Sequence, residues 1–234
     1  MSKNQVKKAI ILAGGLNSRM MPWSKVIPKA LLPVGKKLAI QYLVEECLAS
    51  NLEKIYIVVS KNSLIKKYFT PNPELLNLLK KYHKEEALKK LEKIEAQRKY
   101  LKFIEQPEPL GEAHAFLCAK KYIGDEPVAV LLGDTIYYES KIPAIKQMMQ
   151  MPRNHKLLIL GDGRMILTPE AIKLFEKKYQ AKKNKIDLRI MDVFKPEEIT
   201  FFNIDAAKIE LGTFEEYVGA CARNITIIKE KRSE

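Results

Sequence analysis

The chain has 234 residues, of which 47% are hydrophobic, and its formal net charge is +13. This length fits one large α/β domain or two small ones, and the hydrophobic content is enough for a buried core, which excludes a disordered chain. The cysteines lie far apart in the sequence and form neither a CxxC motif nor a Cys/His cluster (Cys47, Cys118 and Cys221). Their spacing argues against a disulfide framework or a zinc site and is typical of a reducing compartment.

The first apolar run of the chain is short and ends at Gly14. It is therefore predicted to be a strand and not a signal peptide. No apolar stretch approaches the roughly 18 residues that a membrane-spanning helix needs. We expect a cytoplasmic protein without membrane contact.

The positive charge is compatible with a solvated lysine-rich surface, with phosphorylated ligands or with nucleic acid. Nucleic-acid binders usually concentrate their cations in one patch with aromatic residues between them. Here lysines alternate with glutamates along predicted helices, as in residues 80–99. This pattern makes nucleic acid the least favoured of the three interpretations.

Short apolar runs alternate with helical patterns over the first 135 residues. The predicted strands are residues 8–14, 54–60, 101–106 and 127–134, and the predicted helices are 38–50, 62–69, 73 to about 99, and 111–123. The strands are continuous apolar runs, which is typical of a parallel sheet covered on both faces. Their alternation with helices predicts an α/β fold with a doubly wound, mostly parallel sheet in three α/β/α layers.

The pattern weakens after Thr135. Strands are predicted at 156–160 and 199–204, and a helix at 168–178 that begins with Thr168 as its N-cap and Pro169 at its first position. A last helix is predicted within 211–230. No repeat or linker divides the chain, so a single domain is expected over 1–234.

Ligands of doubly wound folds bind at the carboxyl ends of the strands, which here are followed by the loops 14–33, 106–111 and 133–135. In the first loop, Gly14 and Gly15 let the backbone approach a phosphate, while Arg19 and Lys29 supply cations. Three prolines are expected to hold this loop extended (Pro22, Pro28 and Pro33). An ordinary surface turn is the alternative, but the recurring cations between prolines favour a nucleoside triphosphate.

Two carboxylates follow apolar strands at this expected rim. Asp134 ends the run LLGD, and Glu210 lies in KIELGT. Magnesium takes one or two protein carboxylates together with phosphate oxygens, so the pair forms a candidate magnesium site. A cap on a turn or helix is the alternative role for Asp134.

The segment EQPEPLGEAHAF is predicted to be a turn that leads into a helix. Gln106 can bond the edge of a base, and Gly111 lets a flat ring lie against the backbone. His114, on the first turn of that helix, is expected to pack or cap there without taking part in chemistry.

Taken in order, these stretches resemble the sugar-nucleotidyltransferase family, specifically the bacterial UTP–glucose-1-phosphate uridylyltransferases, or UDP-glucose pyrophosphorylases. LAGGLNSRMMPWSKVIPKALLPV looks like the signature loop of the family, and EQPEPLGEAHAFLCAKKYIGDEPVAVLLGD is the best-matching segment. ELLNLLKKYHKEEALKKLEKI is similar to the helical insertion of the uridylyl enzymes, and GRMILTPEAIKLFE and IELGTFEEY resemble later landmarks. The resemblance extends over nearly the whole chain.

The resemblance implies a Rossmann-like nucleotidyltransferase fold with a nucleotide-binding part at 1–135 and a reduced acceptor-side part at 156–234. It implies UTP and a sugar 1-phosphate as substrates, Mg²⁺ as cofactor and self-association into a homo-oligomer. The residues it implies are Arg19 and Lys29 for catalysis, Ala13, Gly14, Gly15, Gln106 and Gly111 for nucleotide binding, and Asp134 and Glu210 for the metal.

The chain departs from the family pattern at several positions. Asn17 and Ser18 replace a glycine and a threonine of the signature loop, and asparagine tolerates the positive φ that such a turn needs. A block that carries the family's glutamate–lysine–proline motif is missing between Asp134 and residue 156, and a further family lysine falls on Phe214. Both lysines belong to the acceptor side of the family's site, where Lys208 and Arg164 are the candidate replacements.

The reaction that the resemblance implies is attack of a sugar 1-phosphate on the α-phosphorus of UTP, with release of pyrophosphate. The nucleophile is already an anion, so charge neutralisation and positioning are needed more than a general base. A nucleotide-binding or regulatory relative without turnover is the second hypothesis, and nucleic-acid binding through the positive charge is the third.

Overall fold

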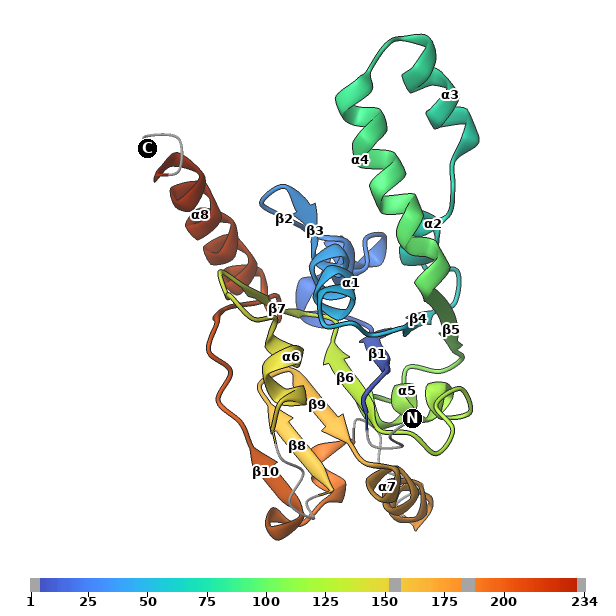
Figure 1. Cartoon of the computed structure of the whole chain (residues 1–234), viewed down its shortest axis with the longest axis vertical. Helices are drawn as coiled ribbons and strands as arrows, with labels where there is room; N and C mark the ends of the chain where they lie inside the picture. The colour runs from blue at the N-terminus through green and yellow to red at the C-terminus, as the bar shows by residue number, and fades with distance from the viewer. Residues whose placement is uncertain (1–4, 152–156, 182–187, 231–234) are drawn as a thin grey trace.

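The computed structural model describes residues 5–151, 157–181 and 188–230, with side chains up to residue 222. At its centre lies a seven-stranded sheet with the order β10-β8-β9-β6-β1-β4-β5 (Figure 1). The strands are β1 (Lys8–Ala13), β4 (Lys54–Ser60), β5 (Leu101–Gln106), β6 (Val128–Leu132), β8 (Leu158–Gly161), β9 (Arg164–Leu167) and β10 (Ile199–Phe201). β1 runs parallel to β4 and β6, and β4 runs parallel to β5, whereas β9 is antiparallel to β6 and β8. The mostly parallel sheet expected from the sequence is confirmed.

Helices cover both faces of this sheet. They are α1 (Ala39–Ala49), α2 (Leu64–Phe69), α5 (Glu112–Lys120), α6 (Ala144–Met149) and α7 (Pro169–Ala181). Ile11 of β1 faces a core cluster that includes residues of α1, α2 and α6, while its neighbour Ile10 faces a second cluster with residues of α5 and α7. Successive residues of a strand point to opposite faces, so a strand buried on both faces is apolar throughout. The three-layer α/β/α prediction is confirmed.

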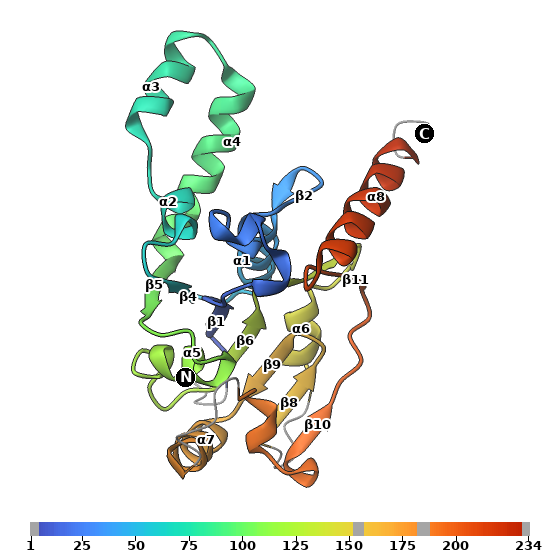
Figure 2. The ribbon, with the colours of Figure 1, turned by 180° about the vertical axis from the view of Figure 1, so that it is seen from behind.

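Two small sheets flank the main one. β2 (Pro33–Val34) pairs with β3 (Lys37–Leu38), and β7 (Thr135–Tyr138) pairs with β11 (Ala207–Glu210). Helix α8 (Phe214–Glu230) follows β11 and extends from the body of the molecule (Figure 2). Ala220 of α8 shares a buried cluster with Val34 and Ile136, so this late helix packs against the early β2–β3 segment.

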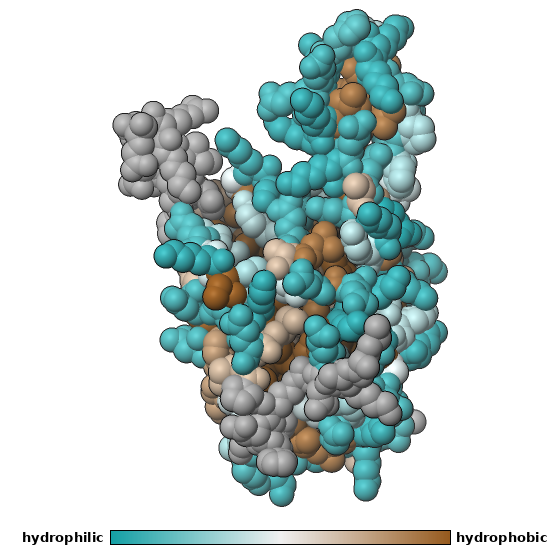
Figure 3. Space-filling model, in the orientation of Figure 1, coloured by the Kyte–Doolittle hydropathy of each residue, from teal (hydrophilic) through white to brown (hydrophobic). Residues whose placement is uncertain are grey.

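The segment predicted as one helix from 73 to about 99 is two helices, so that prediction is wrong. α3 (Pro73–Lys81) and α4 (Glu85–Ala96) form a hairpin that projects beyond the sheet (Figures 1 and 2). The helix breaks because His83 has a left-handed backbone with φ 52°. Apolar side chains gather between the two helices, within a largely hydrophilic surface (Figure 3).

The other predicted elements agree with the structure to different degrees. The strands at 54–60 and 101–106 have the predicted bounds, and Thr168 caps α7 by accepting a hydrogen bond from the amide of Ala171 at 3.2 Å. The predicted strand at 156–160 begins outside the described residues and corresponds to β8. β7, α6 and β9 were not predicted, because segments of four to six residues are too short to show a reliable period.

Among the described residues, no helix is both long and apolar enough to cross a membrane.

A buried ion pair and its hydrogen bonds link β9, α1, β7 and α6. Arg164, with 0% of its side chain exposed, donates to both carboxylate oxygens of Glu46 at 2.9 and 2.7 Å. It also donates to the backbone oxygens of Thr135 and Gly163, while Glu46 accepts from the amide of Ile145. The guanidinium of Arg164 is therefore buried and hydrogen-bonded inside the protein. The prediction of Arg164 as a candidate replacement for an acceptor-side lysine is wrong.

We predict that Arg164→Met lowers the free energy of unfolding by about 3–5 kcal/mol, because the carboxylate of Glu46 would stay buried without its counter-charge. The double variant Arg164→Met/Glu46→Leu is expected to recover most of that loss, since no charge then remains buried. Urea denaturation of the wild type and the two variants measures both effects. A double variant as unstable as the single one would contradict the charge explanation.

Candidate functional site

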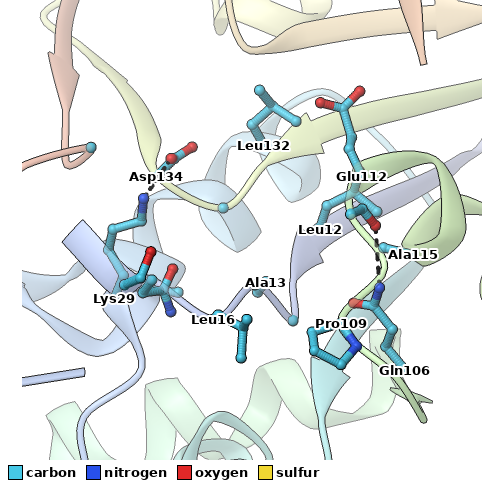
Figure 4. Close-up of a pocket in the computed structure, with 18 of the residues that line it drawn as sticks. Leu12, Ala13, Leu16, Lys29, Gln106, Pro109, Glu112, Ala115, Leu132 and Asp134 are labelled. Carbon is cyan, nitrogen blue, oxygen red and sulfur yellow. Dashed lines mark hydrogen bonds and ion pairs between the residues drawn. The ribbon is translucent and has the colours of Figure 1, made fainter. Parts of the chain in front are cut away.

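A pocket of about 520 Å³ lies at the carboxyl ends of the parallel strands (Figure 4). All three loops expected at this rim contribute to its lining. The predicted site residues in the lining are Ala13, Gly14, Gly15, Arg19, Lys29, Gln106, Gly111 and Asp134. Lys29 and Asp134 lie on one side, and Gln106 and Glu112 on the other.

The first loop is wound into short turns. It forms 3₁₀ turns at Ser18–Met20, Trp23–Lys25 and Lys29–Leu31, so the expected extended conformation is wrong. Proline fixes φ but leaves ψ free, and its φ is compatible with the start of a 3₁₀ turn. Asn17 precedes the first turn with φ 54° and ψ 37°, which confirms that asparagine supports the left-handed conformation expected there.

A cation and a carboxylate from distant parts of the chain meet in the pocket. Nζ of Lys29 lies 2.7 Å from Oδ2 of Asp134, and their side chains are 12% and 33% exposed. The amide of Gly133 donates to the carbonyl of Leu12 at 2.9 Å, which joins the residue after β6 to the end of β1. The predicted phosphate cation and the predicted metal carboxylate are thus direct neighbours.

Gln106 forms the opposite wall of the pocket. It is buried, with 5% exposure, and its Nε2 donates to the carbonyl of Gly111 at 3.2 Å. Its Oε1 lies 2.6 Å from the place where a Cβ on Gly14 would stand, so any side chain at position 14 would force Gln106 to move. Nδ1 of His114 lies 3.2 Å from Nε2 of Gln106 and 3.0 Å from the carbonyl of Glu108, in the packing role expected of this histidine.

Glu112 also lines the pocket, although the sequence patterns did not single it out. It is the first residue of α5, and its Oε1 accepts a hydrogen bond from the amide of Ile190 at 2.9 Å. Burial raises the pKa of its carboxyl group, and the negative charge of Asp134 makes a smaller contribution in the same direction. An acidic residue such as Glu112 is common at the start of a helix, so its position in the sequence offered no reason to assign it to the pocket.

Glu210 does not line the pocket. Its carboxylate accepts a hydrogen bond from Nζ of Lys208 at 2.5 Å, and Lys208 also contacts Asp162. Because β11 pairs with β7, Glu210 lies opposite Thr135, which directly follows Asp134. Among the described residues, no three His, Cys, Asp or Glu side chains gather into a metal-binding group. A magnesium site that combines Asp134 and Glu210 stays a prediction.

An aromatic cluster outside the lining of the pocket includes Phe214, two residues after the lining residue Gly212. Phe214 packs edge-on against Trp23 with 5.0 Å between the ring centroids, and Tyr217 packs against the same indole at 5.6 Å. Phe214 is 48% exposed and stands where the resemblance implied a lysine.

A doubly wound sheet with glycines and cations at the carboxyl ends of its strands defines an α/β protein suited to phosphorylated ligands. The chain belongs to the nucleotidyl transferase family, whose sequence model matches residues 8–171.

Curated relatives match somewhat less than two thirds of the chain. A UTP–glucose-1-phosphate uridylyltransferase of Bacillus subtilis (strain 168), YngB, is 44% identical over 150 residues, which are 64% of this chain and 50% of that protein. Another uridylyltransferase of that name from the same organism is 42% identical over 146 residues, 62% of this chain and 49% of the relative. The chain thus spans about half the length of these relatives.

Solved structures are similar over almost the whole chain. An apo UDP-glucose pyrophosphorylase superposes with a TM-score of 0.81 at 24% identity and covers 97% of this chain and 100% of its own. A UTP-bound UGPase from Acinetobacter baumannii superposes with a TM-score of 0.79 at 22% identity, covering 94% of this chain and 93% of its own. These similarities confirm the fold.

We predict that Gly111→Ala lowers the free energy of unfolding by about 1–3 kcal/mol, because φ 95° and ψ −175° lie in a region open essentially to glycine alone. The control is Gly219→Ala in α8, where a Cβ meets no atom within 4 Å. That variant should be neutral or more stable by up to about 1 kcal/mol, because alanine favours helix. Equal changes in urea denaturation would contradict the backbone explanation.

The raised pKa of Glu112 predicts a pH dependence of stability. The folded protein retains this proton to a higher pH than the unfolded chain, so the contribution of the group is fully present below the ordinary glutamate pKa and is lost as the pH rises through the folded pKa. The wild type should therefore lose stability relative to Glu112→Gln between about pH 4 and pH 7. Urea denaturation of both proteins at these two pH values tests this, and a constant difference would contradict it.

Proposed function

We propose that this protein transfers a uridylyl group from UTP to a sugar 1-phosphate, giving a UDP-sugar and pyrophosphate. Family membership, the names of its curated relatives and the composition of the pocket support the proposal. We take glucose 1-phosphate as the acceptor from the names of those relatives.

One observation carries the proposal: a glycine-lined loop, two cations and a carboxylate meet in one pocket with a buried glutamine on its far wall. The two walls correspond to the two ends of a nucleotide. Gln106 and Gly111 would hold the uracil base, and Arg19 and Lys29 would hold the triphosphate. Ala13, Gly14 and Gly15 run between these walls and would bring backbone amides to the ribose and phosphates.

In this reaction an oxygen of the sugar phosphate attacks the α-phosphorus of UTP in line. A new phosphorus–oxygen bond forms while the bond to the β-phosphate oxygen breaks, and pyrophosphate carries away the electron pair. The attacking oxygen is already anionic, so no side chain needs to remove a proton. The task of Arg19 and Lys29 is to neutralise the charge that otherwise keeps the two anions apart and that builds up in the transition state.

The side chains present fit Mg²⁺ bound jointly with the nucleotide. Mg²⁺ usually keeps several waters and takes one or two protein carboxylates plus substrate phosphates, so the carboxylate of Asp134 in the lining meets the minimum that Mg²⁺ needs from the protein. Glu210 is the second candidate, and it would have to leave Lys208 to reach the pocket. When bound, Mg²⁺ would add positive charge next to the triphosphate.

Fewer residues of the family pattern are present on the acceptor side of the site. Lys208 is occupied by Glu210 and Asp162, and Arg164 lies buried on Glu46. We propose a single domain over 1–234 whose acceptor-side part, at 156–234, is reduced. The cytoplasm remains the expected location.

The test is a coupled assay of pyrophosphate release with UTP, Mg²⁺ and a panel of hexose 1-phosphates. Release with one sugar would support the proposal and identify the acceptor. UTP binding by calorimetry without release for any sugar would contradict turnover and favour a nucleotide-binding or regulatory protein.

We predict that Lys29→Ala reduces kcat by about 10²–10³-fold, because a preorganised charge at the transition state is lost. The matched control is Lys36→Ala, which removes an exposed lysine outside the pocket and should leave kcat unchanged. Unfolding curves of both variants show whether each is folded. Wild-type turnover in Lys29→Ala would contradict the assigned role.

A further inference from the structure

A second cleft, of about 490 Å³, lies at the opposite end of β4 and β5. Half of its ten lining residues are cationic, and none is acidic (Lys54, Lys66, Arg98, Lys99 and Lys102). β5 is the last strand of the main sheet (Figure 1), and Leu101, Lys102 and Phe103 of this edge strand line the cleft. It lies where β5 begins, whereas the pocket described above lies where β5 ends at Gln106.

The cations of this cleft have no carboxylate partners within the described part of the chain. None of the five takes part in an ion pair there. The contrast with the adjacent strand is direct, because Lys8 of β1 lies opposite Lys54 and is paired with Glu126. Glu53, next to Lys54 in the sequence, is paired with Lys7. Neighbouring lysines are neutralised, but those of the cleft are not.

Aromatic rings position several of these cations. The guanidinium of Arg98 lies 5.3 Å from the ring centre of Phe103, Nζ of Lys99 lies 5.0 Å from that of Tyr100, and Nζ of Lys102 lies 3.9 Å from that of Tyr122. A ring face attracts a cation without cancelling its charge. The cleft therefore holds unneutralised positive charges close together, where they repel one another and favour a bound anion.

We propose that this cleft binds a small molecule with two or more linked phosphate groups, at a site separate from the pocket of the proposed reaction. Its volume is in the range of small-ligand sites, and its charge matches a polyanion. Of the three aromatic rings in the lining, those of Tyr100 and Phe103 carry cations, and that of Tyr56 is buried and stacks on Tyr122. The site therefore offers phosphate recognition, and none of its lining rings is free for a base to stack on. That feature favours an oligophosphate over single-stranded nucleic acid.

The test measures binding of inorganic tripolyphosphate by calorimetry at low salt. Lys29→Ala serves as the parent, so that binding in the first pocket is weakened. In that parent, a cleft variant carries Lys54→Gln, Lys99→Gln and Lys102→Gln, all at exposed side chains. A control variant loses the same charge from the α3–α4 hairpin through Lys80→Gln, Lys84→Gln and Lys89→Gln, at exposed lysines outside the cleft.

We expect the parent to bind tripolyphosphate, the cleft variant to bind it about tenfold more weakly or worse, and the control to stay within about twofold of the parent. Tripolyphosphate should also raise the melting temperature of the parent and the control but not of the cleft variant. If the cleft variant does not fold, Lys102→Gln alone against Lys89→Gln gives the same comparison.

Three results would overturn the proposal. They are no binding by the parent, equal weakening in cleft and control variants, and a single-stranded oligonucleotide that binds the same lysines more tightly than tripolyphosphate. Equal weakening in both variants would mean that binding depends only on the net charge of the protein. Tighter binding of the oligonucleotide would mean that the surface is a nucleic-acid site. Because the parent lacks Lys29, none of these outcomes depends on whether the proposed transferase activity exists.

Discussion

Parallel pairing of β1 with β4 and β6 is the constraint from which the candidate site follows. It brings the carboxyl ends of these strands to one edge, so loops that lie far apart in the sequence line one pocket. At this edge Gly14 lies so close to Gln106 that a Cβ at position 14 would stand 2.6 Å from Oε1 of that glutamine. The contact between Lys29 and Asp134 then joins the first loop to the segment after β6. The chemistry proposed for the pocket needs all of these contacts together.

The sequence allowed prediction of the parts that depend on local composition. Continuous apolar runs predicted β4 and β5 with the correct bounds. The predicted parallel order of the strands placed their following loops at one edge, and in the structure Gly14, Arg19, Lys29 and Asp134 line one pocket there. Features that depend on tertiary contacts could not be predicted in this way. The break at His83 is a single left-handed residue, and the burial of Arg164 depends on Glu46, which is distant in the sequence. Glu112 was missed because its place in the pocket depends on how α5 meets the first loop.

Charge is distributed unevenly over this basic protein. Its net charge of +13 includes lysines with carboxylate partners, such as Lys8 and Lys120, and the unneutralised group at the start of β5. In the first pocket, by contrast, Lys29 has Asp134 beside it. Of these two places, the cleft has more unneutralised positive charge, and the pocket offers more defined geometry. A phosphate group would be held differently at the two places. In the cleft it would be attracted by several cations, whereas in the pocket it would lie against glycine backbone beside a paired charge.

The pairing of β11 with β7, together with the packing of α8 against β2 and β3, has a consequence for synthesis. Gly212 lines the same pocket as Gly14, almost two hundred residues earlier in the chain. Because a chain emerges from the ribosome N-terminus first, the main sheet can begin to assemble while β11 and α8 are still being made. The pocket is complete only once these late segments dock. A nascent chain therefore carries the early loops of the candidate site for some time before Gly212 can join them.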